Sequence, residues 1–268
     1  MKNKVLGLVV LCLLLSMAAL AGCGTNNDAP GGDNAEALPA QTITVAAAAS
    51  LQEPLVKAIA LYNEAQPNVT VEATYGGSGA LLEQIQNGAP VDIFLSASKK
   101  YITDAETAGL LAENSAFNWL TNSLVVASAA KSEIAVTTLE EVAELQNIAL
   151  GTPESVPAGK YAQEALTNAQ LWEKVEPKVV YAKDVKAVAS YAESGSADVG
   201  FIYASDTVGR DGLKIQFTVD PSLHSPIVYP AAIIANTQVM EASQSFIDFL
   251  KTDAAKAIFA EYGLGAAE

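Results

Sequence analysis

The segment Thr42-Ile43-Thr44-Val45-Ala46-Ala47-Ala48-Ala49-Ser50-Leu51-Gln52-Glu53 sets the fold class of this chain. A short β-prone run is followed by small residues, and residues 50–53 have the Ser-x-x-Glu form of a helix capping box. We therefore expect a strand, a turn of small residues and a helix at about 51–64. Apolar side chains recur at helical spacing along that helix, at Leu55, Ile59 and Tyr62.

The same strand, turn and helix pattern recurs along the chain. A strand at 69–73 leads into Tyr75-Gly76-Gly77-Ser78-Gly79 and a helix at about 80–87, and a buried strand at 91–95 precedes helices around 99–108. A second set follows Asn122, with strands expected at 123–127, 148–150, 178–181 and 199–203 and helices after 156–159 and 183–185. This repetition predicts two α/β lobes. The last piece, a strand at 227–235 and an amphipathic helix at about 240–262, fits either lobe.

The beginning of the chain has the features of a secretory leader. Lys2 and Lys4 precede an apolar run that ends in Leu20-Ala21-Gly22-Cys23, which has the form of a lipobox. We expect residues 1–22 to be a cleaved signal peptide and Cys23 to carry a lipid anchor outside the cytoplasmic membrane. A transmembrane helix is the alternative, but the apolar run is short for a full span. Residues 23–41, rich in Asn, Asp, Gly and Pro, should form a flexible linker.

Composition and motifs exclude several classes of function. The formal charge is −15, and it becomes −17 when Lys2 and Lys4 leave with the signal peptide, which argues against a basic face for nucleic acid. Of the two cysteines, Cys12 falls in the signal peptide and Cys23 is the expected lipid site, and the single histidine, His224, sits in a turn-rich stretch where we expect it to be solvated. The folded part thus lacks the usual zinc ligands and any thiol chemistry. With no nucleophile elbow, Walker loop or His-Glu-x-x-His motif, we expect no cofactor, no free metal cation and no catalysis.

Four places combine a strand end, small residues and a helix start: Ala49-Ser50, Gly77-Ser78-Gly79, Pro157-Ala158-Gly159 and Asp184-Val185. Helix N-termini present unpaired N–H groups and a partial positive charge, so several that converge form an anion site without lysine or arginine. Each feature alone has a plainer interpretation. Ser50 and Asp184 fit helix caps, the glycines fit a tight turn, and Tyr203 at a strand end fits packing.

Taken in order, these segments resemble the molybdate-binding proteins of ABC transporters along nearly the whole mature chain. The resemblance rests on residues 43–51, 75–81, 88–97, 122–126, 156–162, 184–185, 200–206 and 229–233. It implies an α/β fold of the two-lobed, type II periplasmic-binding-protein-like class, with two crossovers and the ligand in the interlobe cleft. Lobe 1 would comprise residues 42–122 plus 229–268, and lobe 2 residues 123–228.

The resemblance also implies the ligand set and the function. The oxyanion would be held by the hydroxyls and backbone of Ser50 and Ser78, the backbone N–H groups of Ala158 and Val185, and the Tyr203 hydroxyl. The implied protein is a monomeric, lipid-anchored solute-binding protein that captures molybdate, and tungstate with it, and delivers it to an ABC permease. Four alternatives stay open: a receptor for another tetrahedral oxyanion such as sulfate, an amino-acid receptor, a hydrolase of phosphate esters, and a structural lipoprotein. A molybdate receptor would have to exclude the smaller sulfate ion by the size of its cavity. The amino-acid receptor is disfavoured because Arg210 is the only arginine.

Overall fold

The computed structural model describes residues 38–267. The predicted signal peptide at 1–22, the predicted lipid site Cys23 and the predicted linker up to residue 37 lie outside the described residues. Within the described range, no helix has the length and apolar character needed to cross a membrane. Leu38, at the end of the predicted linker, is buried; its N–H donates to the Gln66 side chain, and its carbonyl accepts from Asn68. The folded part therefore holds the chain from Leu38 onward.

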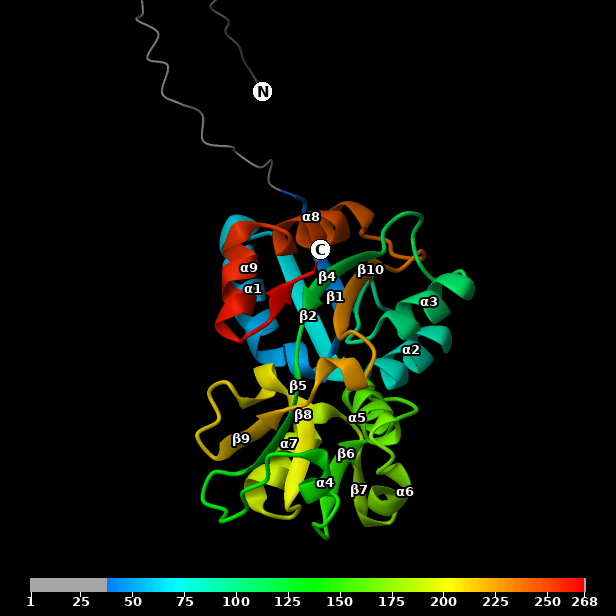
Figure 1. Ribbon diagram of the computed structural model, residues 1–268. Coiled ribbons are helices and arrows are strands. Elements are labelled where there is room, and N and C mark those ends of the chain that lie inside the picture. The colour runs from blue at the N-terminus through cyan, green and yellow to red at the C-terminus, as the bar shows by residue number, and fades with distance from the viewer. Residues whose placement is uncertain (1–37, 268) are drawn as a thin grey trace, which may run out of the picture. The chain divides into compact units, whose positions relative to one another are not determined.

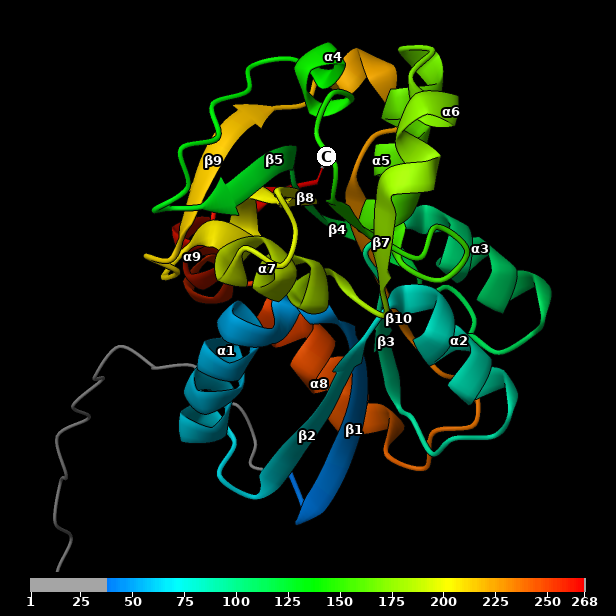
Figure 2. The ribbon, with the colours of Figure 1, turned by 90° about the horizontal axis from the view of Figure 1, so that it is seen from below.

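The first of two mixed sheets has six strands in the order β11-β4-β10-β3-β1-β2. β1 is parallel to β2 and β3, whereas β10 is antiparallel to β3 and β4. The strands are β1 Gln41–Ala48, β2 Val69–Gly76, β3 Ile93–Leu95, β4 Phe117–Thr121, β10 Val228–Ile233 and β11 Gly265–Ala266. The helices packed with this sheet are α1 Gln52–Ala65, α2 Ser78–Gln86, α3 Lys99–Thr107, α8 Met240–Leu250 and α9 Asp253–Glu261, with the 3-10 turn η1 Ala49–Leu51. Figure 2 shows α1 and α2 on opposite sides of β1 and β2. This assembly is lobe 1.

The second sheet has five strands in the order β7-β6-β8-β5-β9. Its strands are β5 Leu124–Ala129, β6 Ile148–Gly151, β7 Val179–Ala182, β8 Val199–Tyr203 and β9 Leu213–Thr218. The accompanying helices are α4 Leu139–Val142, α5 Pro157–Asn168, α6 Trp172–Val175 and α7 Val185–Ser194, with the 3-10 turns η2 Glu176–Lys178, η3 Ala204–Thr207 and η4 Pro221–Leu223. This assembly is lobe 2. The chain passes between the lobes twice, from β4 to β5 and from β9 to β10 (Figure 1).

The predicted α/β class with two lobes is thus confirmed. The burial of its central strands explains why the sequence pattern predicts them. β8 and β10 are buried at every residue, as expected for strands whose sheet is covered by helices on both faces. Such strands appear in the sequence as short continuous apolar runs. Edge strand β9 is only partly buried and gives a weaker signal, and neither β9 nor β4 is among the expected strands.

Two local predictions are wrong. The single helix expected at about 240–262 is two helices, α8 and α9, because Thr252 caps the second one by accepting the N–H of Ala255 at 3.3 Å. The capping box at Ser50 does not form either. Ser50 is the middle residue of η1, no side chain caps η1 or α1, and Ser50 Oγ instead lies 2.9 Å from Tyr229 Oη. The Ser50 side chain is therefore available for another role.

Candidate functional site

The five residues expected to bind the ligand all line one cavity between the lobes. Ser50 in η1 and Ser78 at the start of α2 come from lobe 1, whereas Ala158 in α5, Val185 in α7 and Tyr203 at the end of β8 come from lobe 2. The cavity has a volume of about 10 Å³, close to the least that holds one water molecule. None of its lining residues is charged; the others are Ala48, Ala49, Gly76, Gly77, Ala97, Val156 and Pro157.

Three helices begin at this cavity, and the first N–H groups of a helix have no partner inside it. Ser78 opens α2, Val185 opens α7, and Ala158 follows Pro157 in the first turn of α5. The proline at the first position has no N–H that would need an acceptor. Each helix start contributes partial positive charge, so the cavity favours an anion although no cationic side chain lines it.

The hydroxyl oxygens of the two serines contact other protein groups. Ser78 Oγ accepts the backbone N–H of Ala97 at 3.0 Å, and Ser50 Oγ lies 2.9 Å from Tyr229 Oη. Both serines are buried. Because a hydroxyl has one proton and two acceptor lone pairs, Ser78 keeps its proton for a further acceptor. Ser78 is thus placed to donate into the cavity.

Tyr203 supplies the clearest sign that the cavity takes a ligand. Its side chain is 1% exposed, and its hydroxyl has no hydrogen-bond partner among the described residues. An unpaired buried hydroxyl costs about 1–3 kcal/mol. Burial, reinforced by nearby Tyr229, raises the pKa of Tyr203 well above its usual value, so this hydroxyl keeps its proton. A ligand that accepts a hydrogen bond would relieve that cost.

The glycines beside Ser78 let the lobes approach at backbone distance. The N–H of Gly79 donates to the carbonyl of Ser155 across the cleft at 2.9 Å. A Cβ on Gly79 would lie 2.7 Å from Ser155 Cα, and one on Gly77 would lie 2.9 Å from Ser155 O. Glycine is therefore needed at both positions for the close contact between the lobes. The sequence alone had also allowed a simple tight turn here.

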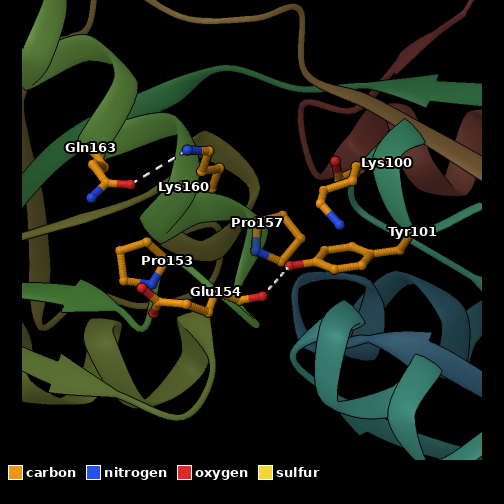
Figure 3. A pocket seen from close by; sticks show the side chains of 8 residues that line it. Lys100, Tyr101, Pro153, Glu154, Pro157, Lys160 and Gln163 are labelled. Carbon is orange, nitrogen blue, oxygen red and sulfur yellow. Dashed lines mark hydrogen bonds between the residues drawn. The ribbon is translucent and has the colours of Figure 1, made fainter. Parts of the chain in front are cut away.

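A second, larger pocket of about 190 Å³ adjoins the first, with Pro157 common to both linings. Figure 3 shows Tyr101 of α3 pointing across the cleft, where its hydroxyl donates to the Glu154 carbonyl at 2.8 Å. Lys100 of lobe 1 and Lys160 of lobe 2 both line this pocket. Cationic side chains from the two lobes thus stand next to the uncharged cavity.

An ion cluster also joins the lobes. Lys186 of α7 pairs with Glu53 of α1 and lies 3.3 Å from Asp206, which is fully buried. Asp206 also accepts the N–H of Tyr203, so the cluster adjoins the cavity wall. Burial raises the pKa of Asp206, and the Lys186 charge opposes that rise.

Sequence patterns missed several of these residues. Tyr229 and Asn122, which form the hydrogen-bond network behind Ser50, lie 179 and 72 residues away from it in the chain, and only the resemblance covers them. The lysine and carboxylates of the ion cluster carry no local signal. His224, expected in solvent, is half-buried, with Nδ1 2.8 Å from the Ser225 carbonyl and its ring 5.8 Å from that of Tyr161; it does not line the cavity.

Comparison with known proteins agrees with this architecture. The model of the family described as bacterial extracellular solute-binding protein matches residues 43–265. A provisionally named ABC transporter substrate-binding lipoprotein of Bacillus subtilis (strain 168) is 35% identical, over 96% of this chain and 97% of its own length. The molybdate-binding protein ModA of Escherichia coli (strain K12) is 34% identical, over 82% of this chain and 88% of its own.

A solved structure gives the same result for the fold. The periplasmic molybdate-binding protein of Azotobacter vinelandii matches with a TM-score of 0.77 and 25% identity, covering 84% of this chain and 100% of that one. The family model spans nearly all of the described residues, and relatives above 30% identity cover most of the chain. The chain therefore belongs to the bacterial extracellular solute-binding protein family.

Proposed function

We propose that this protein binds molybdate, and tungstate with it, in the cavity between its lobes and delivers the anion to an ABC permease for import. One observation carries the proposal: uncharged hydrogen-bond donors from both lobes converge on one buried cavity, and one of them, the Tyr203 hydroxyl, has no partner among the described residues. Such a lining holds an anion by aimed dipoles and hydroxyl protons. The molybdate-binding relatives support the choice of anion.

The character of the lining favours a fully deprotonated dianion. Phosphate near neutral pH often carries a proton, which would face donors and find no acceptor. Sulfate has the same charge as molybdate but is smaller, so the distance between donors on opposite sides of the cavity must select the larger anion. The match to solute-binding proteins supports a receptor role.

The proposed roles of the residues follow from their positions. Ser50 and Ser78 donate from hydroxyl and backbone, Ala158 and Val185 from backbone N–H groups, and Tyr203 from its hydroxyl. Because these groups are divided between the lobes, the anion favours the closed cleft. We place lobe 1 at residues 42–122 plus 229–268 and lobe 2 at residues 123–228, with the two crossovers as the hinge.

The location of the protein is part of the proposal. Leu20-Ala21-Gly22-Cys23 supports cleavage after residue 22 and lipid attachment at Cys23. The tether then ends before Leu38, because Leu38 is buried and Gln41 begins β1, so it is shorter than the predicted linker of residues 23–41. The domain would work as a monomer on the outer side of the cytoplasmic membrane, next to its permease.

Titration calorimetry tests the proposed ligand. Purified protein is titrated with molybdate, tungstate, sulfate and phosphate under one buffer condition. We expect saturable binding of molybdate and tungstate at one site and much weaker binding of sulfate and phosphate. Equal affinity for all four anions, or preference for sulfate, would reject the proposal.

A further inference from the structure

A chain of hydrogen bonds behind Ser50 has a defined direction, and it begins at Asn122. The backbone N–H of Ser123 donates to Asn122 Oδ1 at 2.8 Å, which identifies the other amide atom as the nitrogen. The two N–H groups of Asn122 Nδ2 then donate to Ser205 Oγ at 2.8 Å and to Tyr229 Oη at 3.1 Å. The Tyr229 oxygen therefore accepts a bond.

Tyr229 must send its own proton onward. Its side chain is fully buried, and buried hydroxyl protons are almost always hydrogen-bonded. Among the described residues its remaining hydrogen-bond partner is Ser50 Oγ, at 2.9 Å, because the hydroxyl of neighbouring Tyr203 makes no hydrogen bond. Burial, followed by the nearby Asp206 charge, raises the pKa of Tyr229 well above its usual value, so the proton stays on Tyr229. The bonds thus run from Asn122 to Tyr229 to Ser50.

We propose that Tyr229, held by Asn122, donates to one lone pair of Ser50 and so directs the Ser50 proton away from Tyr229 and into the cavity. Tyr229 is then a positioning residue that sets ligand selectivity through Ser50. The Ser78 hydroxyl is oriented in the same way, because its oxygen accepts the backbone N–H of Ala97 and its proton is left to donate. Every hydroxyl in the lining therefore presents a proton to the cavity, and a protonated oxyanion such as hydrogen phosphate brings its own proton up against these donors. This inference rests on the proposed function.

A double-mutant cycle separates this role from a structural one. Molybdate affinity is measured by calorimetry for the wild type, Tyr229→Phe, Ser50→Ala and the double variant. We expect Tyr229→Phe to weaken binding about threefold to tenfold in the wild type and not further in Ser50→Ala. The control is Tyr62→Phe, which removes another buried tyrosine hydroxyl, bonded to Ser245 at 3.1 Å, without touching the cavity; its affinity should stay at the wild-type value.

Competition with inorganic phosphate supplies a second readout. At a phosphate concentration that leaves wild-type molybdate binding intact, Tyr229→Phe should lose part of its bound molybdate, because its Ser50 can accept the phosphate proton. Where Tyr229→Phe does not fold, Asn122→Ala replaces it in both experiments. Additive effects in the cycle, an unchanged affinity of Tyr229→Phe, or phosphate resistance equal to wild type would each overturn the inference. A wild type that binds no molybdate would reject the proposed function instead.

Discussion

Adding one methyl group at Gly79 should separate ligand binding from folding. Gly79 is the second residue of α2 and lies against lobe 2, where an added Cβ would stand 2.7 Å from Ser155 Cα and 3.0 Å from both Ser155 O and Tyr101 Cε1. Two of these neighbours are backbone atoms and cannot turn away. The closed form of Gly79→Ala must therefore hold its lobes further apart, at an overpacking cost of about 1–3 kcal/mol.

That cost falls on binding if molybdate requires the closed cleft. We expect the molybdate Kd of Gly79→Ala to rise roughly fivefold to a hundredfold. The open form has no such clash, and alanine is favoured over glycine in a helix by up to about 1 kcal/mol. The ligand-free variant should therefore melt at or slightly above the wild-type temperature, while its affinity falls.

The measurement pairs calorimetric titration with thermal unfolding of the ligand-free protein. Gly88→Ala is the control for an added methyl group: its Cβ would meet no atom within 4 Å and it lies outside the cavity lining, so its affinity should stay at the wild-type value even though its φ of 86° makes alanine there costly for stability. Small-angle scattering should show compaction on adding molybdate to wild type and a smaller change for Gly79→Ala. An unchanged affinity of Gly79→Ala, or a loss of several degrees in its ligand-free melting temperature, would show that Gly79 does not couple lobe closure to binding.

Further predictions concern the ligand groups, the anchor and the buried carboxyl. Ser50→Ala and Ser78→Ala should each remove a charge-assisted hydrogen bond of roughly 1.5–3 kcal/mol and weaken molybdate binding about tenfold to a hundredfold in calorimetry; full affinity in both would remove these serines from the site. Cys23→Ala should move the protein out of the membrane fraction, and an acylated variant that stays there would contradict the lipobox interpretation. Since burial raises the pKa of Asp206, the folded state binds its proton more tightly than the unfolded chain does. The stability of wild type relative to Asp206→Asn should therefore be greatest below the usual aspartate pKa of 3.8 and fall as pH rises through the raised value. Urea unfolding of both proteins at several pH values measures this difference, and a gap that widens with pH would contradict it. Molybdate at a hundredfold excess over its Kd should stabilise the fold by about 2.7 kcal/mol, seen as a higher melting temperature, whereas an equal response to sulfate would indicate a general salt effect.

Local patterns predict most of the fold because the lobes are built from short buried strands and helix starts. β8 is found at 199–203 from its apolar run alone, and the start of α7 from the cap at Asp184, whose Oδ1 accepts the N–H of Ala187 at 2.8 Å. The same patterns join α8 and α9 into one helix, because the apolar period hides a single cap at Thr252.

The site is less accessible to such patterns because its contacts join distant parts of the chain. Ser50 satisfies the capping-box pattern, yet its hydroxyl pairs with Tyr229, 179 residues away. Glu53, the other end of that box, pairs across the cleft with Lys186. Helix starts indicate where anions can bind, but only the folded chain brings them around one cavity. The resemblance contributed the ligand set, and physical pattern alone left each member open to a plainer role.

A crystal structure grown with molybdate tests the place of the binding site most directly, because anomalous scattering locates molybdenum independently of the protein coordinates. We predict one strong peak in the cavity between η1, α2, α5 and α7, with oxyanion oxygens within hydrogen-bond distance of the Ser50, Ser78 and Tyr203 hydroxyls and of the Ala158 and Val185 N–H groups. A peak in the neighbouring pocket between Lys100 and Lys160, with no peak in the cavity, would contradict this prediction.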